Sequence, residues 1–217
     1  MSHDPDILPG RLTLIGQFDS PFVRRVGIAL THGGIGFTHL PWSAFGDAKR
    51  LSAVNPLMRV PALVLEDSSV LVDSAAMLDH IDRRSAVAMR PAAGAARDAA
   101  LRVEGLAVGL AEKAVSLFYE LRLHEKVSDS WARRCREQIA ATALALEAEA
   151  SRLTTPFFLG ETLGHADIAL GCAWRFLREA HPGLLAEQRL LSLVAQCAAL
   201  EAMAPFRAVM QRFIPPS

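Results

Sequence analysis

The sequence predicts a two-domain protein in which a mixed α/β domain comes first and an all-helical domain follows. Alanine marks the division, because residues 1–90 contain 9 alanines and residues 91–217 contain 27, and alanine has the highest helix propensity. In the first part, short apolar runs instead alternate with amphipathic helical patterns. We therefore expect an α/β domain over 1–84, a linker over 85–96 and an all-α helical bundle over 97–217.

The first domain is expected to run strand, helix, strand, a helix or loop, two strands and a helix. The first helical pattern places Val23, Val26 and Leu30 on one face, and Pro21 suits its first turn. Alternating strand and helix predict a parallel pair with a right-handed crossover, and the closing hairpin adds antiparallel strands. The expected elements span residues 12–15, 21–30, 37–42, 61–65, 70–72 and 74–83.

The second domain is expected to contain four or five helices. Pro156 and Pro182 interrupt the helical pattern at points that fall between helices. Gly164 is an acceptable N-cap, and Asp167 three residues later can accept a hydrogen bond from its N–H, as in a capping box. We interpret this box as structural. The expected helices span residues 97–124, 130–153, 165–180, 184–202 and 205–213.

Charge and composition exclude several functional classes. The 23 basic residues balance the 23 acidic residues, so the chain lacks the positive potential expected of a partner for nucleic acid or an anionic membrane. No run reaches 18 apolar residues and the N-terminus is acidic, so we expect neither a spanning helix nor a signal peptide, and we expect a cytoplasmic protein. The 3 cysteines form no CxxC pair and the 7 histidines no HExxH motif, so neither a disulfide framework nor a metal site is expected.

The first candidate motif is Asp19-Ser20-Pro21, at the turn from the first strand to the first helix. Ser20 falls at or near the N-cap, and capping alone explains a serine there. The same geometry has a functional alternative. A hydroxyl at a helix N-terminus can donate to a bound thiolate, and the local field favours that anion.

The second motif is the segment 55–61, which ends in Val60-Pro61 at the start of an expected strand. Because most X–Pro bonds are trans, the residues alone predict a trans bond at Pro61. A cis bond would turn the backbone groups of Val60 outward, where an extended ligand could pair with them.

The third motif is Asp73-Ser74, directly before the next helix. Ser74 is an N-cap candidate, and capping is again the simplest explanation. Alternatively, the Ser74 hydroxyl and the first helical N–H groups bind a carboxylate, with Asp73 beside them for an ammonium group.

In their order and spacing these motifs resemble the soluble glutathione transferase family. A serine at the first strand–helix turn is followed by the NPxxxVP pattern at 55–61, a strand–turn–strand, Asp-Ser and an alanine-rich helical half. The resemblance covers nearly the whole chain and is most specific over 55–81. It implies a thioredoxin-like first domain that binds glutathione and an all-α second domain that supplies most of the electrophile pocket.

Residue by residue, the resemblance implies roles for all three motifs. Ser20 matches the hydroxyl that activates the glutathione sulfur in bacterial, serine-type members. Val60 matches the residue whose backbone pairs with the cysteinyl unit, and Pro61 matches a cis-proline, which reverses the expectation of a trans bond. Asp73 and Ser74 match the Glu/Gln-Ser pair that holds the γ-glutamyl end, although Asp is one methylene shorter than Glu. The implied glutathione-binding residues are Ser20, Phe22, Arg59, Val60, Pro61, Asp73 and Ser74.

Some assignments stay open within the resemblance. Arg59 either flanks the glycyl carboxylate or is a solvated charge. Phe118, Tyr119 and Arg122 lie where the family places electrophile-pocket residues, and they alternatively belong to the core or to an interface. No cysteine precedes Cys135, which disfavours a cysteine-type member.

The resemblance implies a glutathione transferase whose bound thiolate attacks a hydrophobic electrophile, by conjugation or by reductive removal of a leaving group. It also implies a homodimer, with glutathione as cosubstrate and no metal. Fold does not decide function, so a non-catalytic ligand carrier, a protein-binding adaptor or a glutathione-dependent isomerase are the alternatives.

Overall fold

The computed structural model describes residues 4–215, which form two compact units. The first unit contains the described residues up to Val87 together with those from Ala204 onward. The second unit runs from Ala88 to Met203.

A four-stranded mixed sheet is the frame of the first unit. The strands are β1 (Thr13–Ile15), β2 (Thr38–Leu40), β3 (Ala62–Val64) and β4 (Val70–Val72), in the spatial order β2-β1-β3-β4. β1 and β2 are parallel, whereas β3 is antiparallel to both β1 and β4. The expected parallel pair and closing hairpin are both confirmed.

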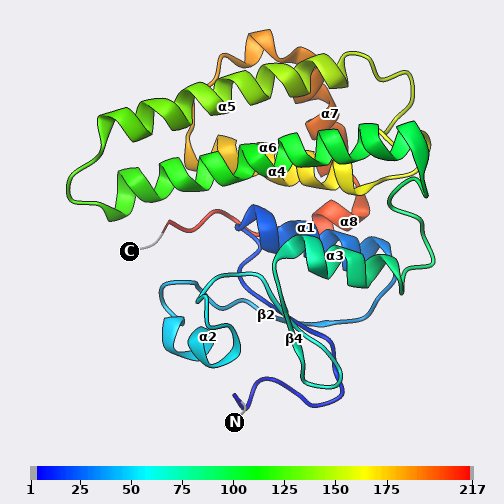
Figure 1. The fold of residues 1–217 in the computed structure, drawn as a ribbon, viewed down its shortest axis with the longest axis vertical. Helices are drawn as coiled ribbons and strands as arrows, with labels where there is room; N and C mark the ends of the chain where they lie inside the picture. Colours follow the sequence, from blue (N-terminus) through cyan, green and yellow to red (C-terminus); the bar gives the residue numbers. More distant parts are fainter. Residues whose placement is uncertain (1–3, 216–217) are drawn as a thin grey trace. The chain divides into compact units, whose positions relative to one another are not determined.

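One face of the sheet carries two helices, α1 (Pro21–His32) and α3 (Ser74–Asp82), which lie side by side (Figure 1). The buried stripe of α1 includes Val23, Val26 and Leu30. These are the positions that share a face at helical spacing, so the sequence pattern determines how α1 packs.

The other face carries the short helix α2 (Ala48–Val54). The sequence predicted either a helix or a loop for this segment. Leu51 is buried and packs in one cluster with Ile15 of β1 and Ala62 of β3. Because successive side chains of a strand point to opposite faces, Leu14 lies on the side of α1 and α3. The central strands β1 and β3 are therefore buried on both faces.

The second unit is helical, as expected. Helix α6 forms its centre, because 12 of its 16 residues are buried and it packs against both α4 and α7. Helix α5 packs beside α4 (Figure 1). No helix within residues 4–215 is long and apolar enough to cross a membrane. The elements are α4 (Gly94–Leu123), α5 (Asp129–Ala150), α6 (His165–Ala180), the 3-10 helix η1 (Glu187–Arg189) and α7 (Leu191–Glu201).

The end of the chain departs from the sequence prediction, which placed residues 97–217 in one helical domain. Helix α8 (Ala204–Ala208) and the residues after it belong to the first unit. Arg24 on α1 explains this, since its buried side chain donates hydrogen bonds to the backbone carbonyls of Phe206 and Val209. A buried guanidinium requires such acceptors, and a local sequence pattern does not reveal them. Helix α4 also begins inside the predicted linker.

Candidate functional site

The three sequence motifs leave the sheet at the same end. Ile15, the last residue of β1, pairs with Ala62, the first residue of β3, and Ala62 pairs with Val72, the last residue of β4. The residues that follow β1 and β4, and those that precede β3, therefore emerge together. We call the segments 16–20, 60–61 and 73–74 the site end of the sheet.

Gly16 makes this close arrangement possible. Its φ is +129°, a backbone conformation that side chains with a Cβ rarely adopt. A Cβ at this position would lie 2.6 Å from Cγ2 of Val23 and 2.8 Å from Cβ of Val60. The lack of a side chain thus lets the start of α1 and the loop before β3 approach the end of β1.

Ser20 is the N-cap of α1, as the sequence predicts. Its backbone is extended, Pro21 follows it in the first turn, and the Val23 N–H donates to Ser20 Oγ over 3.5 Å. That distance is at the long limit for a hydrogen bond. The hydroxyl proton has no acceptor among the hydrogen bonds of the described residues. The first turn of α1 contains no acidic residue, so no charge inside that turn opposes the positive end of the helix dipole.

The Val60–Pro61 peptide bond is cis. The trans expectation from the residues alone is wrong, and the cis bond implied by the family resemblance is confirmed. Asn55 shapes the loop before it, since its amide donates to the Arg59 carbonyl over 2.7 Å and its side-chain oxygen accepts from Leu57 N–H over 3.0 Å. Within residues 4–215, neither the N–H nor the carbonyl of Val60 takes part in a hydrogen bond.

At the third motif, Asp73 rather than Ser74 is the N-cap. The Asp73 carboxylate accepts from Ala75 N–H over 2.8 Å, and Ser74 is the first residue of α3. The expectation that Ser74 caps the helix is therefore wrong by one residue. Asp73 has φ +78°, which is uncommon for a residue with a side chain and carries a conformational cost. Ser74 is buried and follows β4 by two residues, at the end of the sheet where Val60 precedes β3.

His39 was not singled out from the sequence, yet it contacts the site end. Its Nε2 lies 2.8 Å from the Gly16 carbonyl, and its ring stacks on Phe18 with centroids 3.8 Å apart. Burial lowers the pKa of His39, although the hydrogen bond with Gly16 opposes that shift. The neutral imidazole therefore donates to Gly16 and supports the loop that leads to Ser20. A lone histidine on a short strand carries no sequence signal for this role.

The three expected electrophile-pocket residues differ in their exposure to solvent. Phe118 is buried in the second unit, against the rings of Phe176 and His181 at centroid distances of 6.3 Å. This supports the core interpretation of Phe118. Tyr119 is 38% exposed, and the exposed Arg122 guanidinium lies 6.0 Å from the Phe118 ring centroid.

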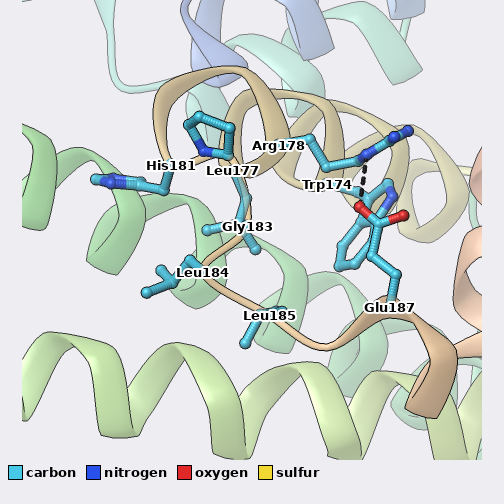
Figure 2. Close-up of a pocket in the computed structure, with 9 residues that line it drawn as sticks. Trp174, Leu177, Arg178, His181, Gly183, Leu184, Leu185 and Glu187 are labelled. Atoms are coloured by element: carbon cyan, nitrogen blue, oxygen red, sulfur yellow. Dashed lines mark ion pairs between the residues drawn. The ribbon is translucent and has the colours of Figure 1, made fainter.

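A cavity of about 140 Å³ lies at the C-terminal end of α6 and was not expected from the sequence. The indole of Trp174 and the ion pair between Arg178 and Glu187 border it on one side (Figure 2). His181 also borders it and uses its Nε2 in a 2.9 Å contact with the Ala114 carbonyl.

No group of three or more His, Cys, Asp or Glu side chains that could hold a metal ion is present in the part of the chain that the structure describes.

The expected capping box at the start of α6 is present. Asp167 accepts from the N–H groups of Gly164 and Phe158, each over 3.1 Å. Burial raises the pKa of Asp167 to about 6, although these N–H donors act in the opposite direction. Asp167 is fully buried in the second unit, which fits a structural role.

Comparison with protein-family models identifies the family to which both parts of the chain are similar. The family model for the glutathione S-transferase N-terminal domain matches residues 19–84, and that for the C-terminal domain matches residues 129–212. Together the two models match more than half of the 217 residues. The chain belongs to the glutathione S-transferase family. The N-terminal match includes all three motifs of the site end.

Individual glutathione S-transferases and related proteins are similar over most of their length. An Escherichia coli (strain K12) protein described as the uncharacterized GST-like protein YibF is 29% identical over 198 residues, which are 89% of this chain and 96% of that protein. The structure of a glutathione S-transferase from Methylobacterium radiotolerans, in complex with glutathione sulfonate, has a TM-score of 0.85 and 26% identity and covers 95% of this chain and 98% of its own. A Pseudomonas fluorescens Pf-5 family member with bound glutathione has a TM-score of 0.78 and 28% identity, covering 95% and 100%.

Proposed function

We propose that this chain is a glutathione transferase that binds glutathione at the site end of the sheet and activates its thiol through Ser20. The thiolate then attacks a hydrophobic electrophile. The observation that carries the proposal is the convergence of a helix N-cap hydroxyl, an unpaired backbone segment at Val60 and a second helix start at Ser74 on one end of the sheet.

Each part of the site end suits one part of a γ-glutamyl tripeptide. The free N–H and carbonyl of Val60 can pair with an extended backbone, as an added strand would. The Ser74 hydroxyl and the Ser74 N–H at the start of α3 suit a carboxylate, and Asp73 beside them supplies the opposite charge for an ammonium group. Arg59 is exposed next to Val60 and suits the carboxylate at the other end of the tripeptide.

Ser20 and α1 supply the chemistry. Within residues 4–215 the serine hydroxyl has no strong partner, so it can donate to a thiolate without breaking an interaction with these residues. The helix dipole favours the same anion, and helix N-termini lower thiol pKa values by one or more units. The contribution of the protein is positioning and anion stabilisation, with no covalent intermediate on the chain.

The related structures support this proposal. Glutathione sulfonate is bound in the Methylobacterium radiotolerans relative and glutathione in the Pseudomonas fluorescens relative. For the electrophile we propose the exposed Tyr119 and Arg122 on α4, with Phe118 packed behind them. The homodimer and the cytoplasmic location expected from the sequence stay predictions.

The proposal is tested with the Ser20→Ala variant and a matched control, Ser128→Ala. Both serines are N-caps of helices, and their Oγ atoms accept at similar distances, 3.5 Å from Val23 N–H and 3.4 Å from Trp131 N–H. Loss of either cap is expected to cost about 1 kcal/mol of stability. Only Ser20→Ala is expected to reduce turnover of glutathione with electrophiles, by about tenfold or more.

Calorimetric titration with reduced glutathione should give saturable binding near one site per chain, with affinities of Ser20→Ala and the wild type within about threefold. Equal turnover in Ser20→Ala and the wild type would refute the role of Ser20. Binding without turnover across a broad electrophile panel would instead indicate a ligand carrier.

A further inference from the structure

The C-terminal segment of the chain holds the loop that carries Ser20. Phe18 N–H donates to Oε1 of Gln211 over 2.8 Å, and Ile214 N–H donates to Oδ2 of Asp19 over 3.1 Å. Both contacts join residues more than 190 positions apart in the sequence, and they involve the two residues directly before Ser20.

The same segment also contacts the first turns of α1, directly after Ser20. Arg24 donates from Nε to the Val209 carbonyl over 3.4 Å and from Nη2 to the Phe206 carbonyl over 3.2 Å. Its guanidinium lies 5.5 Å from the Phe206 ring centroid. The Arg24 side chain is buried, so these contacts are shielded from water and are worth more than exposed ones.

The loop is fixed from its other side by His39, whose ring stacks on Phe18. Phe18 in turn lies against α1 at Gly27, where a Cβ would come within 2.6 Å of the Phe18 ring. The Phe18 backbone is thus held by Gln211 while its ring is held between His39 and α1. Ser20 lies two residues after Phe18, so the contacts that fix Phe18 also restrict the position of Ser20.

The position of the Ser20 hydroxyl needs such support because its own capping bond, at 3.5 Å, is long and weak. Asp19 adds an electrostatic reason. Its carboxylate belongs to the residue directly before Ser20, and the Ile214 N–H donates to that carboxylate. A donor on the carboxylate partly offsets a charge that would otherwise raise the pKa of the bound thiol.

We propose that residues 204–214 are a positioning element for the thiolate site, and that Gln211 is its main positioning residue through the Phe18 N–H. This inference rests on the proposed glutathione-binding function. It assigns a role to a part of the chain that sequence patterns place in the helical domain, far from Ser20.

The test uses Gln211→Met, which keeps the length of the side chain and removes the acceptor oxygen. Gln188→Met is the matched control, because Gln188 is exposed on η1 in the second unit. The first measurement is amide hydrogen exchange over residues 17–20 in the ligand-free full-length protein. Gln211→Met is expected to exchange about threefold to tenfold faster, as loss of one hydrogen bond implies, and Gln188→Met at the wild-type rate.

The second measurement is the ultraviolet absorbance of the thiolate of bound glutathione as a function of pH. In Gln211→Met the thiolate is expected to form at higher pH, so that its fraction near neutral pH falls about threefold. Affinity for S-methylglutathione, which has no ionisable thiol, is expected to change less than about twofold. A merely structural role of Gln211 would lower stability and leave the pH profile unchanged.

The two measurements distinguish failure of the positioning role from failure of the proposed glutathione-binding function. Unchanged hydrogen exchange in Gln211→Met overturns the positioning role, whatever glutathione does. Faster exchange with an unchanged thiolate profile also overturns it, because the loop then moves without effect on the thiol. If the wild-type protein binds neither glutathione nor S-methylglutathione, the proposed function fails, and with it the assignment of residues 204–214 to a thiolate site.

Discussion

At the scale of single residues, Asp167 couples local structure to pH. It is a buried carboxylate that accepts two backbone hydrogen bonds at the start of α6. Burial raises its pKa to about 6 in the folded protein, above the value of about 3.9 for an unfolded aspartate. The folded state therefore binds this proton more tightly than the unfolded state does.

The sign of the pH dependence follows from that difference. The stabilising contribution of proton binding is complete below about pH 4 and is lost as the pH rises through 6. Between pH 5 and 7.5 the wild type should lose about 1 kcal/mol of unfolding free energy relative to Asp167→Asn, which does not titrate. Urea unfolding of both proteins at the two pH values measures this. A difference that stays constant with pH would contradict it.

The same scale shows what single residues could reveal in the sequence. Ser20 was identifiable as an N-cap because a serine before Pro21 at a strand–helix turn is a local signal. The Asp73 cap was placed one residue too late, because aspartate and serine are equally good N-caps and local preference cannot rank them. The cis bond at Pro61 has no local signal at all, and only the family resemblance pointed to it.

At the scale of elements, Gly16 joins β1, α1 and the loop before β3. Gly16→Ala is expected to lower the unfolding free energy by about 3 kcal/mol, because its Cβ would overlap Val23 and Val60 at an unfavourable φ. It should also weaken glutathione binding, since Val60 would be displaced from the site end.

Gly34→Ala is the control for backbone strain alone. Gly34 also has a positive φ, +67°, but nothing lies within 4 Å of the position of its Cβ. Its substitution should cost about 1 kcal/mol, as an alanine in the left-handed region does, and leave glutathione binding intact. Urea denaturation of both variants measures the difference. Equal losses would mean that the contact with Val60 and Val23 is unimportant.

Periodicity predicted most elements because their buried faces repeat at 2 or 3.6 residues, as in α1 with Val23, Val26 and Leu30. Helix α2 was ambiguous for the same reason, since it buries Leu51 alone and a single apolar residue defines no period. The contact of His39 with Gly16 was invisible because it depends on the register between β2 and β1, which a local pattern does not contain.

At the scale of the whole molecule, the two units do not follow the order of the sequence, because the first unit contains both the start and the end of the described chain. The sequence suggests a boundary near residue 84, because the alanine-rich region begins soon after it. The first unit nevertheless requires residues from Ala204 onward, which supply the carbonyl partners of the buried Arg24 and the acceptor for Phe18 N–H. Composition reports helix content, and it does not report which unit a terminal helix joins.

This organisation leads to a prediction about fragments. A fragment of residues 1–84 should lack a cooperative unfolding transition, because it loses the segment that packs on Arg24 and accepts its hydrogen bonds at the Phe206 and Val209 carbonyls. Hydrogen bonds from a charged group each contribute about 1.5–3 kcal/mol, and their loss is a large part of the stability of a small domain. Addition of a synthetic peptide of residues 204–215 should restore part of the transition. Fragment 1–84 carrying Arg24→Met, which cannot donate to the Phe206 and Val209 carbonyls, should respond less to the peptide. Urea titrations followed by circular dichroism compare the three samples, and a cooperative transition in the unmodified fragment would mean that the α/β domain folds without the end of the chain.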